Sequence, residues 1–248
     1  MAGRSATGGY DPSGIDLDEW EILENQLEES IPNYDRVNRL MTFGQDAVWR
    51  KNVRNHATPG MKVLEVGCGP GSFAEDIEEV DLTCLDPSEE MLKVAKVRVE
   101  KARKERGEPP ADYIQAIAES IPIDDNTFDR VFCLFSFRDF QDKKKGLQEI
   151  FRVLKPGGQL VICDAGKANW FHGLAGRIWM STVVQLMARY VTKKKDHPWK
   201  GLAKTYSHYG TNGYYRKLMK EVGYQKVQGR LLLPFGMASR FRGWKPKN

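Results

Sequence analysis

A predicted strand that runs directly into a glycine-rich turn constrains this chain more than any other feature. Residues 63–73 read VLEVGCGPGSF, with glycine at positions 67, 69 and 71. Because glycine has no Cβ, a ligand can lie against the backbone at the carboxyl end of such a strand. A dinucleotide fingerprint would need glycine at position 72, where Ser72 stands, and a phosphate loop would need Gly-Lys-Ser/Thr, which is absent. The turn therefore predicts a ligand site and disfavours pyrophosphate.

Short β-rich runs alternate with helical patterns through the middle of the chain, which is typical of a parallel sheet covered by helices on both faces. The predicted strands are residues 61–66, 81–85, 112–117, 128–135 and 159–164, and the predicted helices between them include 89–106 and 143–154. Two further strand-like runs, 225–233 and 236–242, predict an antiparallel edge at the end of the chain. We expect an α/β, Rossmann-like fold with a mostly parallel seven-stranded sheet.

The segment between the fifth predicted strand and the C-terminal strands has a different pattern. Apolar residues predict one helix from Trp170 to Tyr190, followed by a Tyr- and Gly-rich connection over residues 206–215 and a helix that ends near Gly223. Residues 1–14 are predicted to form a disordered tail. The Lys-Pro-Gly-Gly run at 155–158 is expected to stop a helix and turn the chain into the next strand.

Composition and charge restrict the class of protein. The 248 residues are 41% hydrophobic and 29% charged, and the formal net charge of +5 does not require nucleic acid as a partner. No apolar run is long enough to span a bilayer, so we expect a cytoplasmic protein. The four cysteines lie far apart without a CxxC pair, which predicts neither a metal site nor disulfides.

The charge is unevenly distributed along the chain. Residues 11–31 contain acids but no Lys or Arg, whereas residues 167–204 contain eight basic residues and the single acid Asp196. A solvated helix face explains either run. Aromatic and aliphatic residues interrupt the basic run, so a membrane-surface segment is the alternative interpretation.

Together with an acid at the end of the second predicted strand, the glycine turn resembles motif I of the class I S-adenosylmethionine-dependent methyltransferases. Asp86 stands where a carboxylate can accept both ribose hydroxyls of the cofactor S-adenosylmethionine. Glu65 has two candidate roles, near the methionine amino group or in orienting the turn. The cofactor-binding residues implied by the resemblance are Glu65, Gly67, Cys68, Gly69, Pro70, Asp86, Pro87, Met91, Ile117, Ala118, Glu119 and Leu134.

Four flanking segments narrow the resemblance to the ubiquinone/menaquinone biosynthesis C-methyltransferase family. They are YDRVNRLMTFG at 34–44, ESIPIDDNTFD at 119–129, FRDFQD at 137–142 and FRVLKPGG at 151–158, within a similarity that covers about residues 32–246. The resemblance implies methyl transfer to a ring carbon of a prenylated quinol such as demethylmenaquinol. Deprotonating the quinol raises the electron density of the ring, so a general base and a partner for the phenolate are needed.

Arg138 matches the arginine of an Arg-Asn pair of the family, and Asp139 stands in place of the asparagine. This pair is the predicted catalytic element, acting as an acid and base; the alternative is that it is merely an internal ion pair. Ile117, Leu134 and Pro70 also depart from the residues common in the family, which leaves the acceptor open. The predicted substrate-binding residues are Tyr34, Phe43, Phe137, His208 and Tyr209.

The predicted organisation is a single methyltransferase domain over residues 15–248, with N-terminal helices at 15–57 and a substrate-cap insertion at about 168–212. The expected partner is a lipophilic small molecule. Peripheral membrane contact through residues 168–200 and a homodimer are both kept open. Alternatives for the function are methylation of a phenol, an amine or a lipid, and a catalytically silent cofactor-binding subunit.

Overall fold

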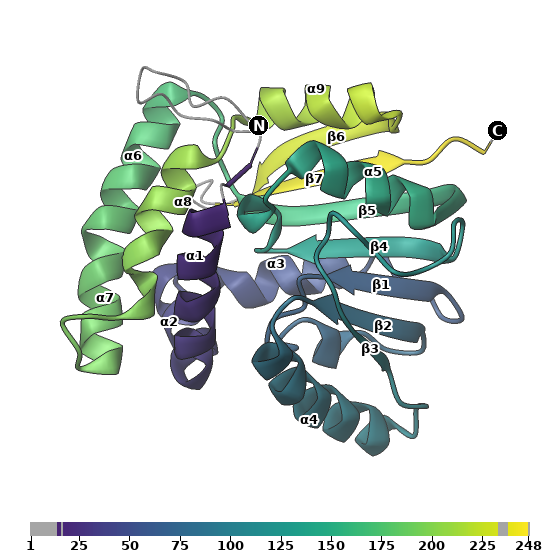
Figure 1. The fold of residues 1–248 in the computed structure, drawn as a ribbon, viewed down its shortest axis with the longest axis horizontal. Coiled ribbons are helices and arrows are strands. Elements are labelled where there is room, and N and C mark those ends of the chain that lie inside the picture. Colours follow the sequence, from purple (N-terminus) through teal and green to yellow (C-terminus); the bar gives the residue numbers. More distant parts are fainter. Residues whose placement is uncertain (1–13, 16, 233–237, 248) are drawn as a thin grey trace.

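A seven-stranded sheet forms the centre of the computed structural model, which describes residues 14–15, 17–232 and 238–247 (Figure 1). The strand order is β3-β2-β1-β4-β5-β7-β6; the first five strands are parallel, whereas β7 runs antiparallel to both β5 and β6. The strands are β1 (Lys62–Val66), β2 (Asp81–Asp86), β3 (Asp112–Gln115), β4 (Phe128–Leu134), β5 (Leu154–Ala165), β6 (Gln225–Leu232) and β7 (Ala238–Trp244). The predicted fold class and its antiparallel edge are confirmed.

Helices cover both faces of the sheet, as expected from its parallel part. One face packs against α3 (Gln45–Arg54) and α4 (Glu89–Arg106), and the other against α5 (Lys143–Val153) and α9 (Asn212–Val222). Side chains of β4 alternate between the two cores, with Phe132 in the first and Val131 and Cys133 in the second. All four cysteines are buried free thiols.

A third group of helices lies beside the carboxyl ends of the parallel strands (Figure 1). It contains α1 (Leu17–Ser30), α2 (Tyr34–Met41), α6 (Trp170–Ser181), α7 (Val183–Thr192), α8 (Leu202–His208) and the short 3-10 helix η4 (Pro198–Gly201). Ligands bind at this end of the strands in open α/β sheets. Elements from the two ends of the chain therefore meet over the predicted site.

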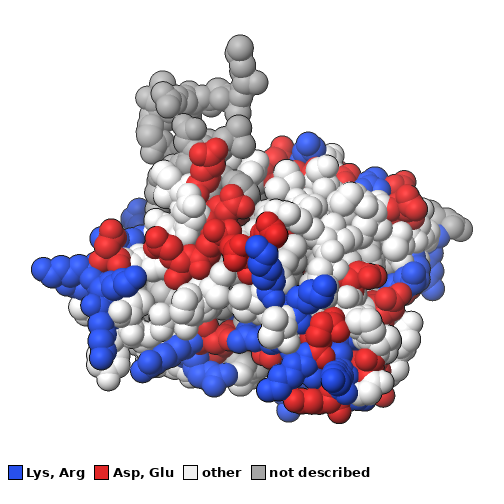
Figure 2. All heavy atoms as spheres, turned by 60° about the horizontal axis from the view of Figure 1, so that its bottom comes forward, with Lys and Arg blue, Asp and Glu red and all other residues white. Residues whose placement is uncertain are grey.

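Hydrogen bonds hold helix α1 in place near both of its ends. Just before it, the Ile15 amide donates to the Gln141 carbonyl oxygen at 3.0 Å. Near its C-terminal end, the Glu28 carboxylate accepts a 2.7 Å hydrogen bond from Ser88 Oγ, and Ser88 in turn caps α4 by accepting from the Met91 amide. Figure 2 shows the acidic side chains that gather along this part of the surface. The acidic run is thus a helix held across the carboxyl end of the sheet.

The prediction of a single helix from Trp170 to Tyr190 is wrong, because the helix is interrupted at Thr182, between α6 and α7. The Ser181 and Thr182 hydroxyls bond to the carbonyl oxygens of Arg177 and Ile178, at 2.8 and 2.6 Å. Such bonds compete with the helix amides, and the β-branched run 182–184 further lowers helix propensity.

Two other boundaries differ from prediction. The predicted connection over residues 206–215 is mostly helical, because α8 extends to His208 and Thr211 caps α9 by accepting from the Tyr214 amide at 3.3 Å. Strand β5 begins at Leu154, ahead of the predicted 159, because Leu154 pairs with Phe128 before a register shift. Residues 1–13 of the predicted tail and 236–237 of the last predicted strand lie outside the described residues. No helix in the described part of the chain combines the length and apolar character needed to cross a membrane.

Candidate active site

A cavity of about 780 Å³ opens at the carboxyl ends of β1, β2 and β4, under helix α1. Its wall comes from the turns after these strands and from α1. The lining residues are Leu23, Glu24, Leu27, Tyr34, Val66, Gly67, Gly69, Leu85, Asp86, Pro87, Ser88, Met91, Ile117, Ala118, Glu119, Leu134, Phe135, Ser136, Asp139 and Phe140. Nine of the twelve predicted cofactor-binding residues are among them, and we call this space the first cavity.

The glycine turn gives the first cavity a wall of bare backbone. Gly69 has a φ of +52°, and a Cβ added there would meet no atom within 4 Å, so the turn faces open space at this position. At Gly67, a Cβ would come within 2.4 Å of the Ser136 Cβ, which follows β4. One glycine therefore leaves room for a ligand, and the other allows two strand ends to approach each other.

Asp86 joins the glycine turn to the start of α4. One oxygen of its carboxylate accepts from the Gly69 amide at 2.7 Å, and the other accepts from the Ser88 amide at 3.0 Å. Burial raises the pKa of Asp86 to about 6, although both backbone hydrogen bonds act to lower it. The carboxylate is thereby fixed at the edge of the cavity with acceptor capacity left for the hydroxyls of a ligand.

Helix α1 closes the first cavity with Leu23, Glu24 and Leu27, none of which the sequence analysis identified. Burial, followed by the nearby charges of Glu28 and Glu21, raises the pKa of Glu24. Among the residues that line this cavity are four acids and no Lys or Arg. The spacing of positions 23, 24 and 27 places them on one helix face, and that pattern was the available signal.

A second cavity of about 620 Å³ adjoins the first. Its wall comes from α1, α2, η4 and α8, together with the segment after β4. Five residues line both cavities: Leu23, Leu27, Tyr34, Phe135 and Asp139. The two spaces therefore meet at a shared wall in which Asp139 supplies the carboxylate.

Arg138 and Asp139 lie in the 3-10 helix η3 (Phe137–Asp139), directly after β4. Arg138 Nη1 donates to Asp164 Oδ1 at 3.0 Å, and the Arg138 amide donates to Asp164 Oδ2 at 2.9 Å. Arg138 Nε lies 3.5 Å from Asp139 Oδ1, and each of these two buried atoms lacks a hydrogen-bond partner among the described residues. Arg138 is thus held by the buried Asp164, and an oxygen of Asp139 is left for a ligand.

Burial raises the pKa of Asp139 to about 6, against the opposing effect of the Arg138 charge. Burial also raises the pKa of Tyr34, whose side chain stands in the same shared wall. A carboxyl group with a pKa near the operating pH is suited to accept and return a proton. The junction of the two cavities can therefore support proton transfer.

Three predicted cofactor residues lie behind the first cavity rather than in its lining. Glu65 is 1% exposed, and its neighbours Val63 and Cys84 belong to the core that packs against α3 and α4. Cys68 and Pro70 are buried within the turn. Burial raises the pKa of Glu65 well above its ordinary value, and its Oε2 lacks a hydrogen-bond partner among the described residues. Strand alternation places Glu65 on the same face of the sheet as Val63, toward the core beside α3 and α4.

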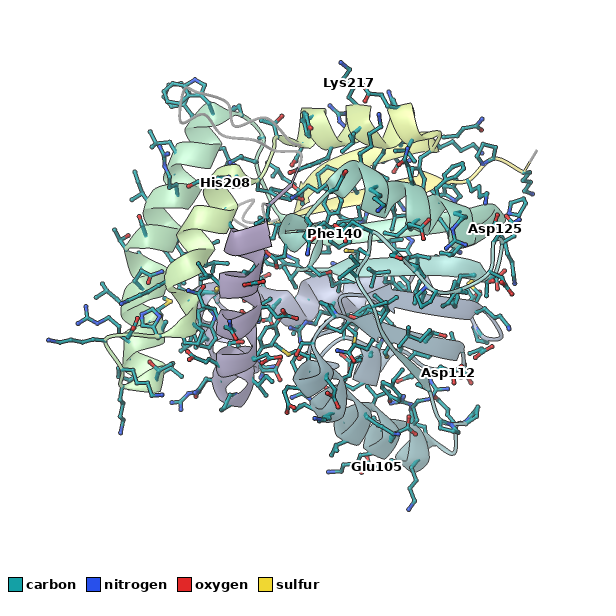
Figure 3. The ribbon with its side chains drawn as sticks, viewed as in Figure 1. Glu105, Asp112, Asp125, Phe140, His208 and Lys217 are labelled. Carbon is teal, nitrogen blue, oxygen red and sulfur yellow. The ribbon has the colours of Figure 1, made fainter. Side chains whose placement is uncertain are left out.

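Of the predicted substrate-binding residues, Tyr34 alone lines the first two cavities. Phe137 and Tyr209 are fully buried in the core, with their ring centroids 6.4 Å apart, which corrects their predicted exposure to a ligand. Phe43 is 55% exposed and packs against Trp179. His208 borders a separate, third cavity between α1 and α8, and lies at the end of α8 (Figure 3). The aromatic segment after β4 therefore supports the site from behind.

In the part of the chain that the structure describes, no cluster of three or more His, Cys, Asp or Glu is suited to hold a metal ion. The residues of the first cavity fit S-adenosylmethionine. The open backbone at Gly69 leaves room for a ligand, Asp86 can accept from ribose hydroxyls, and the acidic lining suits a cation. This cofactor supplies a methyl group activated on a sulfonium sulfur.

Solved structures with the same fold include a SAM-dependent methyltransferase from Thermotoga maritima, with a TM-score of 0.60 and 19% identity, covering 92% of this chain and 99% of that one. Phosphoethanolamine N-methyltransferase 2 of Haemonchus contortus, solved with S-adenosyl-L-methionine, has a TM-score of 0.56 and 17% identity, covering 77% of this chain and 50% of that one. The chain thus has the Rossmann-like fold that these methyltransferases share.

Sequence comparison identifies the family within this class. The chain belongs to the ubiE/COQ5 methyltransferase family, whose sequence model matches residues 20–245. A demethylmenaquinone methyltransferase of Bacteroides fragilis is 28% identical over 232 residues, 91% of this chain and 93% of that protein. A demethylmenaquinone methyltransferase of Desulfitobacterium hafniense is 30% identical over 222 residues, 83% of this chain and 82% of that protein.

Proposed function

We propose that this chain methylates a ring carbon of a prenylated quinol of the demethylmenaquinol type. Its similarity to demethylmenaquinone methyltransferases supports this acceptor, and the first cavity supports the cofactor. One observation carries the proposal: the two cavities share a wall in which Asp139 Oδ1 accepts no hydrogen bond from a described residue and lies 3.5 Å from Arg138 Nε. The acceptor ring belongs in the second cavity, next to this oxygen.

In the proposed reaction, Asp139 accepts the proton of a quinol hydroxyl. The resulting phenolate raises the electron density of the ring carbon that is to be methylated. Arg138, whose Nε has no hydrogen-bond partner among the described residues, stabilises the negative charge that forms beside it. Leu23 and Leu27 of α1 line both cavities, so this helix excludes water while the ring is anionic.

We also propose that residues 168–212 form a substrate cap on a single domain. Four residues of η4 and α8 support this role, because Pro198, Trp199, Leu202 and Thr205 line the second cavity. Helices α1 and α2, within the segment 15–57, supply the facing wall. The cap and the N-terminal helices thus enclose the acceptor between them.

The assay that tests the proposed acceptor supplies S-adenosylmethionine with a labelled methyl group to demethylmenaquinol, a phenol and an amine in parallel. We expect label in a carbon–methyl bond of the quinol alone. Label in the amine or on the oxygen of the phenol, without label in the quinol, would contradict the proposal. Binding of the cofactor without transfer to any acceptor would favour a silent subunit.

A lipid surface is the proposed docking partner of the cap. The outer side of α6 and α7 has five exposed large apolar or aromatic residues, which are Trp170, Phe171, Ile178, Leu186 and Tyr190. Basic residues flank them, namely Arg177, Arg189, Lys193, Lys194 and Lys195. Apolar side chains beside Lys and Arg suit an anionic bilayer surface, in which a prenylated acceptor dissolves.

Co-sedimentation with vesicles of phosphatidylcholine, with and without phosphatidylglycerol, tests this contact. We expect the protein to bind the anionic vesicles. Leu186→Glu should weaken this binding, and so should the combined substitutions Lys193→Glu, Lys194→Glu and Lys195→Glu. The matched control is Val97→Glu, at a residue that is 75% exposed on α4, outside the cap. A stable homodimer in analytical ultracentrifugation that Leu186→Glu dissolves would show that a second copy covers this face instead.

A further inference from the structure

A third cavity of about 470 Å³ lies between the start of α1 and helix α8. Ile15, Ile22 and Leu23 supply the wall on the α1 side, and Thr205 and His208 supply the wall on the α8 side. The described residues that line it include no Asp, Glu, Lys or Arg. Such a groove suits an apolar chain, because burying apolar surface is favourable.

The third cavity continues the second one along helix α1. Leu23, Gln26 and Thr205 line both of them, and Leu23 lines all three cavities. A molecule whose polar ring lies beside Asp139 in the second cavity would therefore reach the third cavity with a substituent. Ile22 is 59% exposed and marks the side on which the groove meets solvent.

A direct path from the second cavity to the outer face of α7 is closed. Trp199, which lines the second cavity, packs into a small buried core with Val37 of α2 and with Ala188 and Val191 of α7. Helix α1, which forms one wall of the groove, is held in place by the hydrogen bonds of the Ile15 amide to Gln141 and of Ser88 to Glu28. The packing thus favours an exit between α1 and α8.

We propose that the third cavity binds the isoprenoid tail of the acceptor, so that α1 and α8 select acceptors by their tails. This inference rests on the proposed function, because it assumes a ring in the second cavity. The tail enters past Leu23, Gln26 and Thr205, which line both cavities, and reaches solvent beside Ile22. Its first isoprene units gain binding energy there, whereas the ring alone orients the reaction.

The test compares two acceptors with the same demethylated naphthoquinol ring, one with a single isoprene unit and one with eight, in detergent micelles. Thr205→Phe narrows the passage between the two cavities, and Ile22→Glu places a charge at the exposed end of the groove. We expect both variants to lower kcat/KM for the eight-unit acceptor at least tenfold, and Ile22→Glu, at a residue outside the second cavity, to change the one-unit value less than twofold. Cofactor affinity and Tm are measured to confirm folding.

Two matched controls carry the same substitution at exposed apolar residues elsewhere, Val97→Glu on α4 and Leu186→Glu on α7. Neither is expected to discriminate between tails in detergent. Equal loss with both acceptors in Ile22→Glu and Thr205→Phe, or tail-selective loss in Leu186→Glu alone, would overturn the groove. Failure of the wild-type enzyme to methylate either acceptor would instead refute the proposed function.

Discussion

The cofactor side and the acceptor side of the site are built in different ways. The first cavity depends on the turns after β1 and β2, where the Gly67 and Cys68 amides donate to the Leu85 carbonyl oxygen and the Gly69 amide donates to the Asp86 carboxylate. The second cavity is assembled from α1 and α2, near the start of the described chain, and from η4 and α8, more than 150 residues later. A turn between neighbouring strands is encoded locally, whereas the acceptor side exists only after tertiary packing.

This difference assigns separate tasks to the two sides. The cofactor side has a pre-formed backbone cradle with one fixed carboxylate, Asp86. On the acceptor side, Asp139 Oδ1 accepts no hydrogen bond from a described residue. It lies beside the Arg138 guanidinium, which Asp164 holds in place. Substitutions should therefore divide into those that change cofactor affinity and those that change turnover. The predictions below test that division.

Asp139→Asn should have the largest effect, because it removes the proposed proton acceptor while keeping the shape of the side chain. We expect kcat to fall by about 10²- to 10⁴-fold, the usual contribution of a general base. Calorimetry should show S-adenosylmethionine affinity within about twofold of wild type. Asp124→Asn, at an exposed position, is the control.

The pH dependence provides an independent test of Asp139. Because its pKa is raised to about 6 by burial, the carboxylate is ionised above that pH and able to accept a proton. Wild-type kcat should therefore fall as the pH drops through about 6, whereas the residual rate of Asp139→Asn should lack this step. An unchanged step in the variant would show that another group titrates.

Arg138→Ala should have the next largest effect, and it should lower stability as well as turnover. It would leave Asp164, which is completely buried, without its ion-pair partner. Breaking a buried pair in this way costs about 3 kcal/mol of unfolding free energy. Urea denaturation would measure it, and Lys93→Ala, which removes exposed ion pairs on α4, should lower the free energy of unfolding much less. Equal losses in the two variants would mean that Asp164 does not depend on Arg138.

The same contrast explains what could be predicted from the sequence. The glycines and Asp86 act through the backbone and through strand ends, so their spacing along the chain was sufficient to place them. Ile117 and Leu134, which were predicted to bind the cofactor, follow recognisable strands and line the cavity wall. The parallel part of the sheet follows from the alternation of strands and helices, and its antiparallel edge follows from the two strand-like runs at the end of the chain.

The failures concern residues whose neighbours come from distant parts of the chain. Phe137 and Tyr209 were expected to face the substrate, but they pack against Tyr215 of α9 in the core. Leu23 and Glu24 were not identified, because an acidic helix normally exposes such positions to solvent. Only the docking of α1 through Gln141 and Ser88 turns this face toward the cavities.

Asp86→Asn should weaken binding of the cofactor without altering the acceptor side of the site. The carboxylate accepts two backbone hydrogen bonds, and an amide nitrogen in its place would face one of those donors. A hydrogen bond to a charged group contributes about 1.5–3 kcal/mol, so we expect the Kd for S-adenosylmethionine to rise about 30-fold. Asp81→Asn, at the exposed start of the same strand, should leave the Kd unchanged. Since burial raises the pKa of Asp86 to about 6, wild-type affinity should also decline below that pH.

Glu24→Gln should have the smallest effect and should separate the cofactor from its demethylated product. The cofactor has a positive sulfonium that the product thioether lacks, and Glu24 adds a negative charge to a cavity lined by no Lys or Arg among the described residues. Because Glu24 is only partly buried, its charge should contribute no more than about 1 kcal/mol. We expect the ratio of the two dissociation constants, measured by calorimetry, to change about three- to fivefold against the cofactor. Glu21→Gln, exposed on the same helix, is the matched control. An equal change in both affinities would mean that Glu24 contributes shape rather than charge. Helix α1 would then close the first cavity without discriminating the positive sulfonium from the neutral thioether.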